Sequence, residues 1–87
     1  MIVGYNVVFV KSALKDLESL PKNINVQIVS KIEMLAFEPR PNGCKKLKGE
    51  ENKWRIRVGD YRVVYSIYDK ELVVEIIAAK HRKEVYD

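Results

Sequence analysis

The sequence has few of the residues that build common catalytic and metal centres. Its 87 residues include one cysteine and one histidine, so a disulfide within the chain and a zinc site of the usual kinds are both excluded. It has no glycine-rich phosphate-binding motif, and no serine has the context of a nucleophile elbow. The scattered acidic residues argue against a two-metal nuclease. We therefore expect neither a metal nor a cofactor.

Long hydrophobic runs are also missing. No segment approaches the roughly 20 apolar residues that a membrane helix needs. The apolar stretch Ile2–Val10 is interrupted by Tyr5 and Asn6, and no small-residue cleavage site follows it. A single cysteine fits a reducing compartment. These features predict a cytoplasmic protein without a membrane partner, and the length predicts one domain over residues 1–87.

Positive charge is abundant and unevenly distributed. The net charge is +4, and residues 40–62 contain eight basic and three acidic residues. A second basic group follows at 80–83. Clustered cations suggest a polyanion such as nucleic acid, an acidic membrane surface or an acidic protein. A solvated basic surface without such a ligand is the alternative interpretation.

A β-hairpin is predicted for residues 54–65, where apolar and basic residues alternate up to a Gly-Asp pair. With Gly59 and Asp60 as the loop, Arg57 lies opposite Arg62, and Arg55 shares their face. The other face is apolar: Trp54, Ile56, Val58, Tyr61, Val63 and Tyr65. Because like charges opposite each other destabilise a hairpin, we expect this exposed arginine face to hold a polyanion. A solvated strand face without a ligand is again the alternative.

The remaining pattern predicts an α+β fold. A strand at 3–10 is followed by a helix from the N-cap Ser12 to about Leu20, and by a second helix from the N-cap Asn23 to about Phe37. Three strands follow, at about 54–58, 61–68 and 72–79. We expect the helical hairpin to pack on one face of a four-stranded, mainly antiparallel sheet, over the apolar side of the strand that begins at Trp54.

Metal-free cleavage of RNA is the chemistry that these residues allow. Cations stabilise the charge that develops on a phosphate in the transition state, and the planar guanidinium of arginine matches phosphate well. RNA supplies its own nucleophile, the 2′-hydroxyl, which DNA lacks.

The order of elements and three motifs resemble the RelE/ParE family of toxins from type II toxin–antitoxin systems. The motifs are Leu-Lys-Gly at 47–49, the hairpin at 54–65 and His-Arg-Lys-Glu-Val-Tyr at 81–86. The resemblance covers essentially the whole chain and implies a RelE-like fold, related to microbial ribonucleases. It implies a toxin that enters the ribosomal A site and cuts mRNA through 2′-hydroxyl attack, leaving a 2′,3′-cyclic phosphate. It also implies a RelB-like antitoxin, a small acidic protein that wraps the toxin.

The resemblance assigns roles to particular residues. The implied catalytic set is Arg55, Arg57, Arg62, His81 and Arg82. Within it, Arg62 matches the arginine that contacts the scissile phosphate. The implied substrate contacts are Lys45, Lys46, Lys48, Lys53 and Tyr86, with the tyrosine stacking on a codon base. RelE-like enzymes often have lysine at positions 55 and 57. Arginine is a poor general base, so we expect His81, or else Lys53, to take that role.

Two alternatives stay open. A ParE-like member would share the fold but inhibit DNA gyrase, and the basic set argues against it. A catalytically weak RelE homologue would bind only antitoxin and RNA. In each case the antitoxin is expected to contact the apolar residues of the first helix, or any exposed part of the stripe Ile24, Ile28 and Ile32, as an amphipathic helix in a groove.

Overall fold

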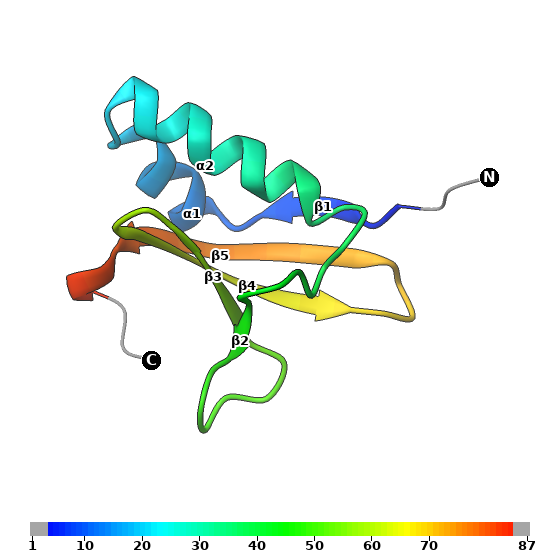
Figure 1. Ribbon diagram of the computed structural model, residues 1–87. Helices are drawn as coiled ribbons and strands as arrows, with labels where there is room; N and C mark the ends of the chain where they lie inside the picture. The colour runs from blue at the N-terminus through cyan, green and yellow to red at the C-terminus, as the bar shows by residue number, and fades with distance from the viewer. Residues whose placement is uncertain (1–3, 85–87) are drawn as a thin grey trace.

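Two helices cover one face of a five-stranded sheet in the computed structural model, which describes residues 4–84 (Figure 1). The strands are β1 (Asn6–Phe9), β2 (Lys45–Lys46), β3 (Trp54–Val58), β4 (Tyr61–Tyr68) and β5 (Val73–His81). Their order across the sheet is β1-β5-β4-β3-β2, with β1 parallel to β5 and every other pair antiparallel. This confirms the predicted α+β class and adds β2, a two-residue strand that the sequence pattern did not reveal.

The helices are α1 (Lys11–Glu18) and α2 (Lys22–Met34). The predicted N-caps Ser12 and Asn23 are wrong, because the observed N-caps lie two residues earlier, at Val10 and Pro21, and neither makes a side-chain cap hydrogen bond. These helices are stabilised by packing against the sheet and not by side-chain caps. Their buried residues recur at helical spacing and face the sheet: Ala13, Leu17, Ile28 and Ile32.

The hydrophobic core lies between the helices and the apolar side of the hairpin. The predicted register is confirmed, since Arg57 lies opposite Arg62 and Ile56 opposite Val63. Gly59 has a φ of +60°, which suits the first position of a two-residue turn. The core residues from the strands are Ile56, Val58, Val63, Tyr65, Ile67, Val74, Ile76 and Ala79. The expectation that the helices cover this face is therefore confirmed (Figure 1).

A β-bulge interrupts the pairing of β4 with β5. Up to Tyr65 and Ile76 the pairing is regular, but Val64 lies opposite Ala78, one residue further along. A one-residue shift exchanges the two faces of a strand. Every β5 residue beyond the bulge therefore points to the face opposite the one that regular pairing would give.

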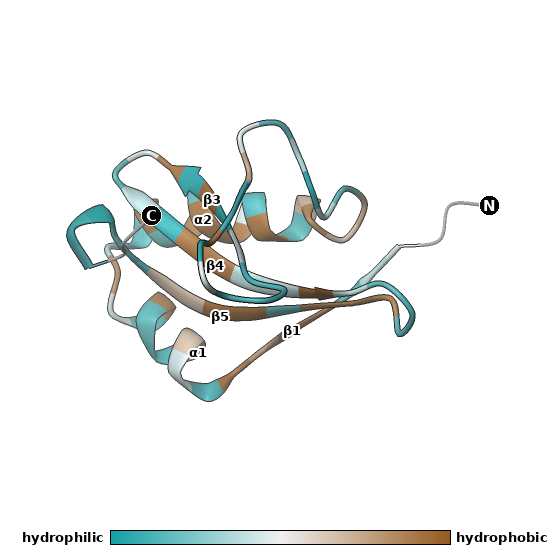
Figure 2. Ribbon diagram, turned by 90° about the horizontal axis from the view of Figure 1, so that it is seen from below, coloured by the Kyte–Doolittle hydropathy of each residue, from teal (hydrophilic) through white to brown (hydrophobic). Residues whose placement is uncertain are grey.

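The view from the sheet side shows α1 beside β5 at the margin of the sheet and α2 behind β3 and β4 (Figure 2). A short 3₁₀ helix, η1 (Arg82–Glu84), follows β5 directly. Within residues 4–84, no helix has the length and apolar character needed to cross a membrane.

Candidate active site

Three basic residues lie in one row across the sheet, and their side chains start from the face away from the helices. Arg57 of β3 is opposite Arg62 of β4, which is in turn opposite Lys80 of β5. Neighbouring strands are about 4.8 Å apart, so the row spans about 10 Å of backbone. We call these three residues the cationic row.

Lys80 is the member that sequence reasoning missed. Regular pairing continued from Tyr65 and Ile76 would place Ala79 opposite Arg62 and turn Lys80 toward the helices. The bulge moves the register by one residue and turns Lys80 to the arginine face. No residue type in β5 indicates a bulge. A register counted along regular strands would therefore not have placed Lys80 on the arginine face.

The three predicted arginines share a face but differ in exposure. Arg57 is exposed, whereas Arg62 is 7% exposed and Arg55 only 1%. The expectation of one open surface carrying all three guanidinium groups is therefore wrong, and Arg62 is not the exposed residue that we predicted. Arg57 is the arginine of this set that solvent reaches.

The guanidinium of Arg62 is directed back to the hairpin turn. Its Nη1 donates to the carbonyl oxygens of Gly59 and Tyr61, at 3.1 and 3.0 Å. These bonds hold one side of the group and order the turn beside Arg57. Arg62 thus has a structural task as well as a place in the row.

Arg55 lies under the edge of the sheet formed by β2. It is opposite Lys45 and, together with residues 45–48, lines a cavity of about 250 Å³. The predicted substrate lysines Lys45, Lys46 and Lys48 are all exposed around it. Lys53 is half-buried, and its ammonium is 3.8 Å from the carboxylate of Glu50. The edge of the sheet at β2 therefore carries exposed lysines, whereas Arg55 beside them is buried.

His81 lies on the opposite face from the cationic row. It is opposite Tyr61 and packs edge-on against that ring, with the centroids 5.4 Å apart. Its Nδ1 accepts a hydrogen bond from the backbone N–H of Lys83 at 3.3 Å. The structure does not bring His81 together with Arg57 and Arg62, because the bulge turns it toward the helices.

Arg82 lies close to the hairpin turn. Its backbone N–H donates to the carbonyl oxygen of Asp60 at 2.7 Å, and its Nε is 3.9 Å from Oδ1 of the same residue. Both side chains are more than half exposed, so this ion pair is weak. Tyr86, the predicted stacking residue, falls outside the described residues.

A different set of charges lies at the other end of β4. Arg40 donates to both carboxylate oxygens of Asp69, with the shorter bond at 3.0 Å, and Tyr5 donates to Oδ1 at 2.7 Å. These bonds lower the pKa of Asp69, with that from Arg40 the larger cause. The guanidinium of Arg40 also lies 5.0 Å from the ring centroid of Trp54. We call Arg40, Asp69, Tyr5 and Trp54 the Arg40 clamp.

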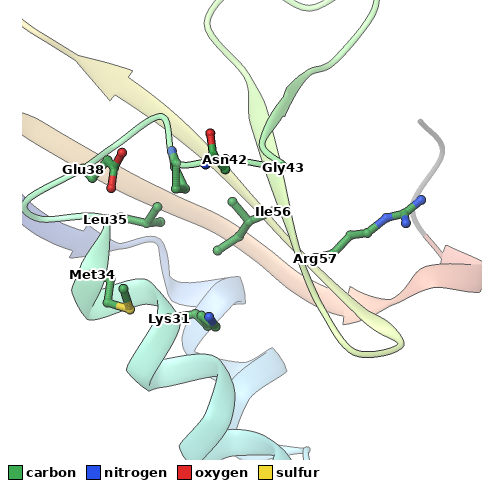
Figure 3. A pocket seen from close by; sticks show the side chains of 9 residues that line it. Lys31, Met34, Leu35, Glu38, Asn42, Gly43, Ile56 and Arg57 are labelled. Atoms are coloured by element: carbon green, nitrogen blue, oxygen red, sulfur yellow. The ribbon is translucent and has the colours of Figure 1, made fainter.

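A cavity of about 230 Å³ lies between α2, β3 and the segment that joins α2 to β2 (Figure 3). Met34 and Leu35 line it from the helix and Ile56 from the strand. Arg57 also lines the cavity, and its guanidinium extends away from Met34 and Leu35 (Figure 3).

Comparison with known proteins extends over nearly the whole chain. Residues 7–86 match the sequence model of a family described as "ParE toxin of type II toxin-antitoxin system, parDE". The chain is 34% identical to Toxin RelE3 of Methanocaldococcus jannaschii, across 93% of this chain and 94% of the relative. It is 31% identical to the mRNA interferase toxin RelE of Escherichia coli K12, across 97% and 92%.

A solved structure is similar as well. A chain of the toxin–antitoxin complex RelBE2 from Mycobacterium tuberculosis matches with a TM-score of 0.82 and 34% identity. The match covers 92% of this chain and 100% of that one.

Proposed function

Since the chain belongs to the RelE/ParE family of type II toxins, we propose that it is a RelE-type toxin that cuts mRNA on the ribosome. The observation that carries this proposal is the cationic row, whose three members are cross-strand neighbours. The E. coli relative named as an mRNA interferase supports the same reaction.

The row suits attack by the RNA 2′-hydroxyl on the adjacent phosphate. That reaction builds negative charge on the non-bridging oxygens, and fixed cations at that point lower the barrier. Exposed Arg57 makes the first contact with the phosphate, in the fork geometry that arginine offers. Arg62, held by the turn, lies beside it. Arg82, attached to Asp60, supplies a further cation at the same end.

Charge stabilisation carries this mechanism, and proton transfer by a side chain contributes little. Arginine stays protonated, and the hydrogen bond with Asp16 raises the pKa of Lys80. His81, the general base expected from the sequence, faces the other side of the sheet. The leading role therefore belongs to the cations, and His81 is a secondary candidate.

We also propose a RelB-like antitoxin as the partner, because the similar solved structure is a toxin–antitoxin complex. Of the stripe whose exposed part was expected to make this contact, Ile28 and Ile32 are buried in the core, and Ile24 is partly exposed. The apolar residues that α2 exposes are Val26 and Met34, each 59% exposed. Met34 also borders the cavity beside β3 (Figure 3), so we place the antitoxin contact there.

A translation reaction with purified protein tests the function. We expect translation to stop and the mRNA to be cut in phase with the codons, and addition of the cognate antitoxin to prevent both effects. Intact mRNA in an arrested or unaffected reaction would contradict the proposal.

The matching family is described as ParE toxins, so inhibition of DNA gyrase is the second candidate activity. A ParE-like protein would inhibit DNA gyrase and would not cut mRNA. A supercoiling assay with the same preparation separates the two, because inhibition of gyrase together with intact mRNA would favour that activity.

A further inference from the structure

Asp16 of α1 connects the first helix to the last member of the cationic row. Its Oδ1 accepts a hydrogen bond from the ammonium of Lys80 at 3.0 Å. Its Oδ2 accepts one from the backbone N–H of Ala79 at 3.1 Å. The carboxylate side chain is 15% exposed. Both carboxylate oxygens are thus used on two adjacent residues of β5.

The free edge of β5 explains why a carboxylate belongs there. β1 pairs with β5 only from Val73 to Ile76, so in the described structure no strand continues along that edge beside Ala79. α1 takes the place of a strand, as the view of the sheet margin shows (Figure 2). Asp16 then satisfies a backbone donor that a missing strand would have left exposed.

Because Asp16 is bonded to the backbone N–H of Ala79, its carboxylate has a fixed position, and it holds the ammonium of Lys80 at that position. Lys80 starts from the arginine face, opposite Arg62. Its ammonium nevertheless bonds to Asp16 of α1, the helix that lies beside β5 at the margin of the sheet (Figure 2). Lysine has a flexible stem whose freedom is lost when it binds a ligand, and a contact that holds the stem beforehand reduces that loss.

We propose that Asp16 is a positioning residue that holds Lys80 at the margin of the sheet, where it contacts the RNA phosphate next to the scissile one. The inference depends on the proposed nuclease function. Arg57 and Arg62 contact the scissile phosphate, and Lys80 is one strand further out, turned outward. The role of Asp16 is to align the RNA backbone, so it affects binding of the substrate more than the chemical step.

Lysine suits this task as a point charge that does not need the two-bond geometry of arginine. The hydrogen bond with Asp16 is the largest cause of its raised pKa, and the nearby charges of Asp16 and Glu84 act in the same direction. Lys80 therefore remains a cation throughout the neutral range. The side chain is 41% exposed, which leaves room for a phosphate.

Cleavage kinetics on programmed ribosomes test the inference. We expect Asp16→Asn to raise KM about two- to fivefold, the range that a partly exposed ion pair supports, with kcat unchanged. Lys80→Ala should raise KM at least as much, and the double variant should equal Lys80→Ala alone. Lys80→Arg should raise KM less than Lys80→Ala does, because it retains the charge.

Asparagine keeps an oxygen that accepts from the N–H of Ala79, so Asp16→Asn preserves the attachment of α1, and thermal unfolding checks this. Asp69→Asn, which removes a carboxylate from the Arg40 clamp, is the matched control and should keep the parental KM. A parental KM in Asp16→Asn, a loss confined to kcat, or an additional loss in the double variant would overturn the inference.

The ion pair itself is measured without RNA. NMR titration of the Lys80 side chain should show a pKa that falls in Asp16→Asn, and an unchanged pKa would overturn the positioning role. Parent protein that fails to cut mRNA would overturn the proposed nuclease, whereas an active enzyme that is indifferent to Asp16→Asn overturns this inference alone.

Discussion

Near the turn from β4 to β5, Arg40 is bonded to Asp69 and lies over Trp54. Near the Gly59–Asp60 turn, at the other end of β4, Arg57 and Arg62 lie directly opposite each other on neighbouring strands. Within residues 4–84 no carboxylate is within 4.0 Å of Arg57. One end uses a cation to join loops to the sheet, and the other end keeps cations together despite their repulsion. Opposed cations destabilise a hairpin and so indicate a ligand, although Arg62 also stabilises the turn through its bonds to the carbonyl oxygens of Gly59 and Tyr61.

The same comparison corrects the sequence-based view of charge. Arg40 was counted with the basic residues that indicate a polyanion, but its guanidinium is occupied by Asp69. Lys80 was counted only in the smaller basic group at 80–83, yet it lies in the cationic row. The number of basic residues in a segment therefore says less about a binding site than their register does.

Replacement of Arg57 by alanine should have the largest effect on activity. Its side chain is exposed, so folding should be unchanged, while the loss of a cation at the phosphate should reduce cleavage about 10²- to 10³-fold. Single-turnover cleavage on programmed ribosomes measures this. Lys70→Ala, which removes an exposed cation at the opposite end, is the control. Equal activity in Arg57→Ala and the parent would remove Arg57 from the site.

Replacement of Arg62 by alanine should affect both activity and stability. The variant loses two bonds from a buried guanidinium to the carbonyl oxygens of Gly59 and Tyr61, and each bond to a charged group is worth about 1.5–3 kcal/mol at most. Urea unfolding should show a clear loss of stability alongside the loss of cleavage. A fully stable but inactive Arg62→Ala would show that the bonds to the turn contribute nothing to folding.

Replacement of Arg40 by alanine should affect stability alone. Loss of its contact with Trp54 should cost about 0.5–1 kcal/mol, measured by urea unfolding at pH 7, and cleavage should stay at the parental rate. A large loss of cleavage without loss of stability would place Arg40 at the RNA site and end the contrast between the two ends.

The pH dependence of Arg40→Ala follows from Asp69. Because Arg40 lowers the pKa of Asp69, the pair contributes stability above the unfolded pKa of about 3.9 and loses it as pH falls through the lower folded value. The difference in stability between Arg40→Ala and the parent should therefore shrink on acidification below about pH 4.

Replacement of His81 by glutamine should have the smallest effect. A general base usually contributes about 10²- to 10⁴-fold, whereas we expect a much smaller loss because His81 faces the helices beside Tyr61. The pH–rate profiles of the parent and of His81→Gln should likewise coincide. A loss of 10²-fold or more would restore His81 as the base.

Local features were predictable from the sequence, and features that depend on distant contacts were not. The alternation around Gly59-Asp60 determines the hairpin register, because a two-residue turn allows one pairing. The bulge in β4–β5 depends on how both strands fit the core, and it decides which of Lys80 and His81 joins the arginines.

The alternation of apolar and basic residues also did not predict which arginines are buried. Arg55 and Arg62 have the alternation of solvent-facing strand residues, yet they are 1% and 7% exposed. Arg55 lies opposite Lys45 of β2 and lines a cavity together with residues 45–48. β2 contains only two strand residues and no apolar alternation. Such a short strand forms because β3 offers it an edge, so its own sequence carries little signal.

The most direct test uses mRNA with a single 2′-deoxynucleotide at the position whose 2′-hydroxyl would attack. Programmed ribosomes carrying this mRNA and the all-ribose parent are compared for cleavage at that codon. We predict that the ribose mRNA is cut and ends in a 2′,3′-cyclic phosphate, while the deoxy position is not cut. Cleavage of both at the same rate would contradict an enzyme whose cations act on an attack made by the RNA itself.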